Sequence, residues 1–223
     1  MAYAQIVVLE MSSVCDSDTF FKALNGFFEE HGYELYPVLN QFRKYREGGF
    51  TNVIFSNTQY ADRLVVECTF GCRINLVEET VMPFSNGVNG YKEESNTTVT
   101  NLANYLGKPG FKLRVENTSS LEESVCFVKT FFETEGFEFL EKMTSVRQVE
   151  AFFNANPTGN SMYSFNHQLR AFRGITLATI AQNPRWEELR KEYLQLLSKY
   201  GTPPIIIDKF NRLCSHLARI SLN

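Results

Sequence analysis

The sequence predicts an α+β protein: an antiparallel β-meander with a flanking N-terminal helix, followed by a C-terminal bundle of about five helices. Three observations support this fold class. An aromatic stripe at helical spacing follows residue 16, a β-branched and aromatic texture extends from residue 33 to about residue 84, and helix-capping signals recur after residue 118. We therefore predict a sheet-rich half at 1–118 and a helical half at 119–223, packed together as one unit.

The first half is predicted to begin with a short strand at 4–10 and a helix. Asp16, Ser17 and Asp18 are candidate N-caps for this helix. Its apolar stripe consists of Phe20, Phe21, Leu24, Phe27 and Phe28. Gly32 with Tyr33 beyond it is the pattern of a glycine C-cap, so we expect the helix to end there.

The following segment is predicted to form strands. Gly48-Gly49 favours a hairpin into a strand at 50–56. Residues 63–77 are long enough for one bent strand or two, with a possible bulge at Gly71. A loop is expected from Asn86-Gly87 and Asn89-Gly90 through the polar residues 92–98, and a last strand at 111–116.

Helix signals dominate the second half. Ser119 or Ser120 with Glu122 or Glu123, and Ser145 with Gln148, have the spacing of capping boxes. After a loop at 154–161, a helix is expected through residues 165–180. Asn183-Pro184 to Gly201 and Thr202-Pro203 onward then delimit two final helices.

Two segments have similar sequences, 27–35 (FFEEHGYEL) and 131–139 (FFETEGFEF). Their separation is far longer than the repeat of a solenoid, which is roughly 20–50 residues. An aromatic-striped helix that ends at a glycine cap would show the same features twice without duplication. We therefore interpret the similarity as the same helix-ending pattern occurring twice, and not as a duplication.

Composition restricts the classes of partner. The net charge of -3 and a pI near 5.7 make nucleic acid an unlikely partner. The N-terminal apolar run is short and lacks a preceding Lys or Arg, and no segment approaches the roughly 18 apolar residues of a membrane helix. Five scattered cysteines are typical of reduced thiols, so the sequence predicts a cytoplasmic protein without a membrane partner.

The common catalytic and cofactor motifs are missing from the sequence. There is no phosphate-binding glycine-rich loop, no dinucleotide fingerprint, no HExxH and no GxSxG. Cys68 and Cys72 lack the CxxC spacing of zinc and redox sites and are interpreted as packing thiols. The sequence therefore predicts no catalytic residue, no metal site and no cofactor.

One helix face combines basic side chains. His167, Arg170 and Gly174 form an i, i+3, i+7 row, with Arg173 nearby. A histidine and two arginines on one face are suited to bind a carboxylate or a phosphate. The alternative is the solvated face of an amphipathic helix.

Two further features are candidate binding residues. Arg43, Lys44 and Arg46 alternate with Phe42 and Tyr45, as in a small nucleic-acid platform or in a charged edge strand. Trp186, the only tryptophan, either anchors a partner or fixes its helix to the core.

Residues 136–142 (GFEFLEK), with Ser145 and residues 149–154, resemble the C-terminal part of bacterial domain-of-unknown-function proteins, as does the stretch 181–193. The resemblance implies a helix–meander half followed by helices, and no active site. Some bacterial proteins of this layout resemble immunity proteins, which bind one partner. We therefore expect a non-enzymatic intracellular protein that binds a protein partner. The alternative is a small enzyme or anion-ligand binder that uses the face of His167, Arg170 and Arg173.

Overall fold

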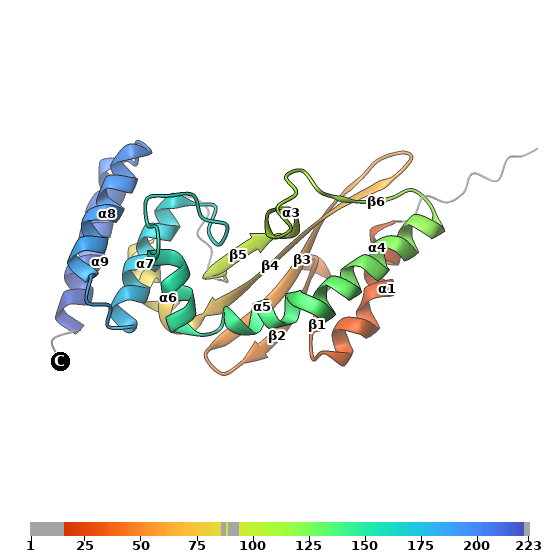
Figure 1. The fold of residues 1–223 in the computed structure, drawn as a ribbon, viewed down its shortest axis with the longest axis horizontal. Helices are drawn as coiled ribbons and strands as arrows, with labels where there is room; N and C mark the ends of the chain where they lie inside the picture. The colour runs from red at the N-terminus through yellow and green to blue at the C-terminus, as the bar shows by residue number, and fades with distance from the viewer. Residues whose placement is uncertain (1–15, 86–87, 89–93, 221–223) are drawn as a thin grey trace, which may run out of the picture.

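The computed structural model describes residues 16–85, 88 and 94–220. It confirms the fold class, because an antiparallel sheet lies at the centre, one helix precedes it and a run of helices follows (Figure 1). The strand expected at 4–10 and the turns expected at Asn86-Gly87 and Asn89-Gly90 lie outside the described residues.

The sheet is a meander of strands in the order β1-β2-β3-β4-β5, with β6 beside the start of β4. Every pairing in the described part of the chain is antiparallel. The strands are β1 (Glu34–Tyr36), β2 (Gln41–Arg46), β3 (Gly49–Gln59), β4 (Leu64–Ile74), β5 (Thr98–Asn101) and β6 (Leu113–Val115). The predicted hairpin at Gly48-Gly49 is confirmed, with Arg46 paired to Gly49 across a tight turn.

The expected bulge at Gly71 is wrong. The pairing of β3 with β4 runs without interruption from Gly49 opposite Ile74 to Gln59 opposite Leu64. A Cβ atom at Gly71 would overlap the carbonyl oxygen of Thr98. Glycine is therefore required here by the close approach of the neighbouring β5 backbone.

The strand expected at 63–77 ends earlier, at Ile74, and the chain continues as helix α2 (Asn75–Val81) and a 3₁₀ turn, η2 (Met82–Phe84). Val77, Glu78 and Val81 are all buried, and α2 packs on α7 (His167–Ile180). Burial of one helical face therefore outweighs the β-propensity of the valines.

Helix α1 (Ser17–Glu30) follows the prediction closely. Asp16 caps it by accepting a hydrogen bond from the Thr19 amide. At the other end the Tyr33 amide donates to the Phe28 carbonyl and the Gly32 amide to the Glu29 carbonyl, as in a Schellman motif. The predicted glycine cap is thereby confirmed.

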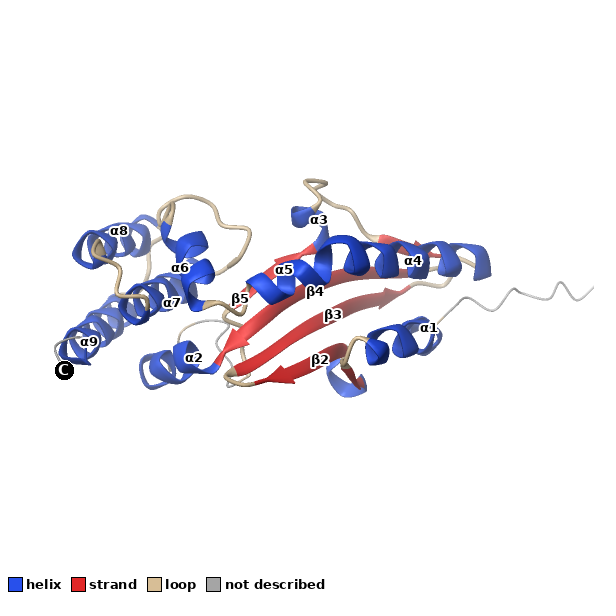
Figure 2. Cartoon of the chain, turned by 60° about the horizontal axis from the view of Figure 1, so that its bottom comes forward, coloured by secondary structure: helices blue, strands red, loops and turns tan. Residues whose placement is uncertain are grey.

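Helices α4 (Thr118–Phe131) and α5 (Phe137–Lys142) are joined by a π-helical turn, η3 (Phe132–Gly136). The N-cap of α4 is Asn117, whose side chain forms a reciprocal pair with Ser120, so the expected caps at Ser119 or Ser120 are wrong. Figure 2 shows α1, α4 and α5 on the same face of the sheet. The short helix α3 (Leu102–Tyr105) follows β5.

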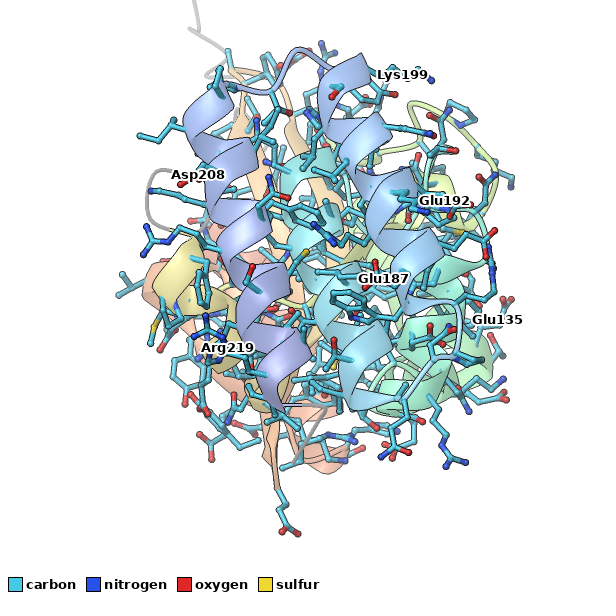
Figure 3. The ribbon with its side chains drawn as sticks, turned by 90° about the vertical axis from the view of Figure 1, so that its left-hand side faces the viewer. Glu135, Glu187, Glu192, Lys199, Asp208 and Arg219 are labelled. Atoms are coloured by element: carbon cyan, nitrogen blue, oxygen red, sulfur yellow. The ribbon has the colours of Figure 1, made fainter. Side chains whose placement is uncertain are left out.

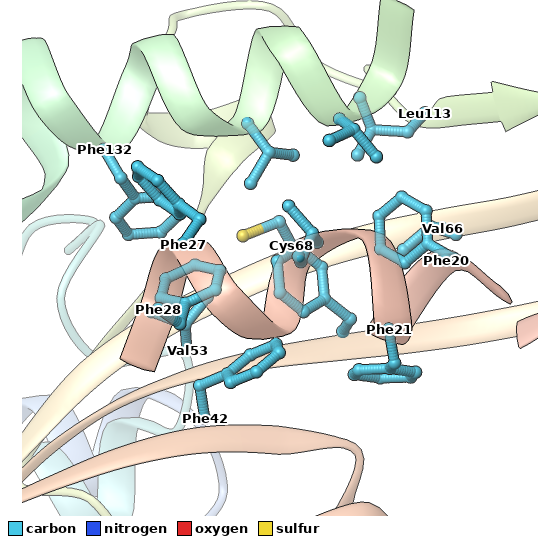
Figure 4. Close-up of a cluster of buried hydrophobic side chains, with 14 of the residues drawn as sticks. Phe20, Phe21, Phe27, Phe28, Phe42, Val53, Val66, Cys68, Leu113 and Phe132 are labelled. Carbon is cyan, nitrogen blue, oxygen red and sulfur yellow. The ribbon is translucent and has the colours of Figure 1, made fainter. Parts of the chain in front are cut away.

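The core under these helices consists largely of phenylalanines (Figure 4). The ring of Phe28 stacks on Phe42 at 4.4 Å between centroids and lies edge-on to Phe132 at 5.3 Å. The two similar segments of the sequence therefore meet in space, but their glycines differ. Gly32 ends a helix with a φ of 79°, whereas Gly136 continues one with a φ of -64°. A Cβ at Gly136 would overlap the Phe132 ring, so close packing explains this second glycine.

The other end of the molecule contains α6 (Val146–Asn154), α7, α8 (Trp186–Lys199) and α9 (Pro204–Ile220) (Figure 1). Figure 3 shows α8 and α9 side by side, with charged side chains such as Glu187, Lys199 and Asp208 along them. The two final helices are confirmed, but the expected start of α8 at Asn183-Pro184 is wrong, because Arg185 is the N-cap and Asn183 only accepts from its amide in the preceding turn. Ser145 precedes α6 but its side chain makes no capping hydrogen bond, so the second capping box is wrong.

The helical segments divide between two regions. The hydrophobic core between the sheet and its helices includes Val125 and Val128 of α4 and Leu140 of α5. At the other end of the molecule, α2 packs against α7. A third cluster, with Cys72, Val149 and Leu177, connects the two. The division into halves at 118 and 119 stays a prediction.

Candidate functional site

Helix α7 carries the three side chains of the expected basic face. Asn166 caps this helix by accepting hydrogen bonds from the amides of Gln168 and Leu169. Arg170 and Arg173 are only 4% and 3% exposed, so neither belongs to a solvated face. Each of the three side chains contacts a different part of the protein.

Arg173 forms a buried ion pair with Glu78 of α2. Its Nε donates to Oε1 at 2.8 Å and its Nη2 to Oε2 at 2.9 Å, which is bidentate geometry. The hydroxyl of Thr97 also donates to Oε1 and in turn accepts from the Ile74 amide. Arg173 therefore connects α7, α2 and the segment before β5, and it is committed to structure.

Arg170 binds backbone carbonyls instead of a carboxylate. Its Nη2 donates to the carbonyls of Phe153, at 3.2 Å, and Asn156, and its Nη1 donates to the carbonyl of Gly159. These carbonyls belong to the end of α6 and the loop after it. Burial lowers the pKa of Arg170, although an arginine remains charged at neutral pH.

His167 begins α7 and stacks on Tyr200, which follows α8, with ring centroids 4.5 Å apart. Its Nε2 is buried and has no hydrogen-bond partner in the described part of the chain. Burial lowers the pKa of the imidazole, which favours its neutral form near pH 7.

His167 and Arg170 line one small hollow of about 220 Å³, and Arg173 does not. The other lining residues are Gly159, Asn160, Ser161, Ser164, Phe165, Leu196 and Tyr200. None of the residues that line it is acidic. His167 and Arg170 therefore do not form an exposed face together with Arg173. They line a hollow at the N-terminus of α7, which we call the α7 hollow.

Tyr200 and the two serines were not among the sequence candidates. The signal for Tyr200 was present, because two helices joined by a short turn are antiparallel neighbours. The start of α7 must then lie beside the end of α8. No comparable local signal identifies the serines of the loop.

Arg43 and Tyr45 meet on the face of the sheet opposite α1 and α4. The guanidinium of Arg43 lies 4.1 Å from the ring centroid of Phe50, donates to the Tyr45 hydroxyl at 2.9 Å, and pairs with Glu94 at 3.0 Å. Tyr36 also contacts this group, with its ring centroid 5.2 Å from Cζ of Arg43. The predicted mixing of cations and aromatics is therefore real on this face.

The other two cations of β2 have structural partners. Lys44 donates to the carbonyl of His31 at the end of α1, and Arg46 forms a bidentate pair with Glu141 of α5. The alternation of a strand therefore separates Arg43 from Lys44. Of the three basic residues of β2, only Arg43 therefore lies on this face, so the row of cations expected from β2 does not form there.

A second hollow, of about 480 Å³, lies beside Arg43. It is lined by Leu39, Gln41, Arg43, Asn52, Ile54 and residues 94–96. Amide side chains form a row across its floor, because Asn96 donates to Asn52 and Asn52 donates to Gln41, each at 2.8 Å. We call this surface, with Val38 and Tyr45 at its margin, the open sheet face.

Trp186 is half-buried at the start of α8. Its indole Nε1 donates to the hydroxyl of Thr179 at 2.7 Å, and its ring packs against the core of the helical end. Of the two roles considered for it, fixing the helix to the core matches these contacts.

Three of the cysteine thiols, those of Cys68, Cys72 and Cys214, are buried, whereas Cys126 is exposed. Burial raises the pKa of the thiols of Cys68, Cys72 and Cys214, reaching about 12 for Cys72 and for Cys214. In the described ranges, no three His, Cys, Asp or Glu side chains are grouped so as to hold a metal ion.

Comparison with family models, with curated proteins and with solved structures gave no match. The resemblance to bacterial proteins of unknown function therefore stays a prediction. None of the described helices is both long enough and apolar enough to span a membrane.

Proposed function

We propose that the protein is a non-enzymatic binding protein that engages a protein partner through the open sheet face. The observation that supports this most is the hollow beside Arg43. It has apolar side chains, Leu39 and Ile54, over a floor of hydrogen-bonded amides. A rigid polar floor with an apolar margin is typical of a site that accepts a side chain of a partner.

The margin of this hollow is unusually apolar. Val38 is 95% exposed on the 3₁₀ turn η1 (Pro37–Leu39), and Leu39 and Tyr45 are both about half exposed. Tyrosine and arginine, together with tryptophan, are enriched among the energetic centres of interfaces. Arg43 is already ordered by Phe50, Tyr45 and Glu94, so binding would cost little side-chain entropy at this position.

The chain offers a matched control for the test. Tyr60 is exposed to a similar degree as Tyr45, at 48% against 56%, and likewise lies near an arginine, with Arg63 5.3 Å from its ring centroid. It follows β3 at the end remote from the hollow. A photo-crosslinking amino acid is placed at position 45 in one variant and at position 60 in another.

In the cells that make this protein, we expect one discrete crosslinked product from position 45 and none from position 60. With the partner purified, Leu39→Asp and Tyr45→Ala should each weaken binding by about tenfold or more, and Tyr60→Ala by less than about twofold. Equal crosslinking at both positions, or unchanged binding by Leu39→Asp, would contradict the proposal.

A further inference from the structure

We propose that the α7 hollow is a binding site for a small oxyanion, a carboxylate or phosphate group of a small molecule. This site is separate from the open sheet face and does not depend on the function proposed for that face. Its centre is the guanidinium of Arg170 beside the ring of His167.

The first argument is electrostatic. The chain carries more acidic than basic side chains, 25 against 22, yet none of the residues that line the α7 hollow is acidic. The neighbouring hollow on the other side of Arg170, lined in part by Asn104, Asn156 and Tyr163, also lacks acidic residues. A buried arginine without a carboxylate partner therefore faces two hollows that are free of negative side chains.

The second argument is hydrogen bonding. Nε of Arg170 and Nε2 of His167 are buried and have no partner within the described residues. Leaving such a nitrogen unsatisfied is costly. Nε of Arg170 is a donor, and Nε2 of His167 is a donor in the tautomer that carries its proton there, so a ligand that accepts hydrogen bonds would satisfy both. The hydroxyl of Ser161 lines the same hollow and accepts from the Tyr163 amide, so its own proton can be donated to a ligand, whereas Ser164 already donates to the Asn166 carbonyl.

The third argument is the position in the fold. The hollow lies at the first residue of α7, where the amide ends of a helix of 14 residues attract negative charge. The Asn166 side chain accepts from the amides of Gln168 and Leu169, and its carbonyl accepts from the Arg170 amide. The volume of about 220 Å³ is below that of pockets for drug-sized ligands, which begin at about 300 Å³, and therefore suits a small anion.

The test uses the ring signals of the three histidines in nuclear magnetic resonance spectra of the full chain. Sodium phosphate and sodium acetate are added separately at pH 7, with sodium chloride to hold the ionic strength constant. The His167 signals should shift and saturate at millimolar anion. His31, bound to the Phe27 carbonyl, and His216, against Phe84, serve as controls within the same molecule.

Saturation by phosphate alone assigns a phosphate ligand to the site, and saturation by acetate alone assigns a carboxylate. No saturable shift of His167 with either anion, or equal shifts of all three histidines, overturns the proposal. Because the open sheet face plays no part in this titration, its result is independent of the partner experiment.

Variants locate the anion by calorimetric titration. Arg170→Lys keeps the charge but loses the planar donor geometry, and should weaken anion binding by about tenfold. Ser161→Ala, which leaves the arginine contacts intact, should weaken it by about threefold. Arg212→Lys, at an exposed site on α9, is the control and should leave the affinity unchanged. Wild-type affinity in Ser161→Ala and folded Arg170→Lys would contradict the site.

Discussion

Arg170 and Arg173 lie about one turn apart in α7 and are equally buried, but the regions around them compensate their charges in different ways. Arg173 faces α2 and is matched by the carboxylate of Glu78 in bidentate geometry. Arg170 faces the loop after α6 and is matched by carbonyl dipoles and by the hydroxyl of Tyr193, without a carboxylate. The carboxylate of Glu78 neutralises the charge of Arg173, which therefore has a structural role. Arg170 has no carboxylate partner, so its positive charge can attract a ligand.

The difference also separates structural from functional candidates. Residue type and spacing made the two arginines equivalent members of one basic face. The segments that pack against them differ: α2 contacts Arg173, and the 155–160 loop contacts Arg170. These segments decide which of the two arginines is available to a ligand. The predictions below test whether the two regions differ in this way.

The largest effect is expected on breaking the ion pair of Arg173. Glu78→Gln leaves a buried cation without its carboxylate and should lower the free energy of unfolding by about 3–5 kcal/mol. Denaturant unfolding followed by circular dichroism measures this change. The double variant Glu78→Met with Arg173→Met removes both charges and should be clearly more stable than Glu78→Gln alone. If the double variant is no more stable than Glu78→Gln, the cost of Glu78→Gln does not come from leaving the charge of Arg173 unpaired.

A smaller effect is expected at the other arginine. Arg170→Met removes a cation without leaving a buried anion, and its cost should be about 1–3 kcal/mol, mainly from the carbonyls that lose a donor. Hydrogen exchange should increase in residues 153–160 and remain unchanged in α2. If Arg170→Met costs as much as Glu78→Gln, the contrast between the two regions fails.

The smallest effect is a dependence on pH. Burial lowers the pKa of His167 below its ordinary value of 6.5, so the unfolded chain binds more protons than the folded chain in that range. The contribution of His167 to stability is therefore complete above about pH 6.5 and is lost as the pH falls toward the folded pKa. Among the described residues, Tyr200 stacks on this ring, Arg170 lines the same hollow, and Lys199 lies over the other aromatic ring of the stack, that of Tyr200.

His167→Gln should make stability less dependent on pH than the wild type between about pH 5 and about pH 7, measured by denaturant unfolding at each pH. His216→Gln is the matched control for loss of an imidazole. An unchanged pH profile in His167→Gln would show that the burial of His167 does not affect its protonation.

Much of the local structure followed from the sequence. The stripe of α1, its Schellman end at Gly32 and the glycine that follows α8 at position 201 were predicted correctly, because each depends on neighbouring residues. The start of α8 was predicted too early, since its N-cap is Arg185 and not Asn183. Helix α2 was missed, since its valines have β-propensity and only packing against α7 selects the helix. Strand β5 was missed for a similar reason, because a strand of four residues depends on its neighbour in the sheet.

The candidate sites show the same limit. The residue types at 43, 45, 167 and 170 were recognised from their chemistry, but Leu39, Glu78 and Tyr200 were not. Leu39 and Glu78 occupy segments whose sequence shows no distinguishing pattern. The protein-partner role, the immunity-like role and the cytoplasmic location stay predictions.

By itself the sequence determined the α+β class, the order of most elements and the positions of several helix ends, because periodicity and capping act over a few residues. The tertiary structure decided which buried arginine received a carboxylate. That choice depends on Glu78 and Arg173, 95 positions apart, and on the antiparallel packing that brings Tyr200 to His167. Contacts of this separation leave no local trace, since each partner is compatible with many others until the chain has folded.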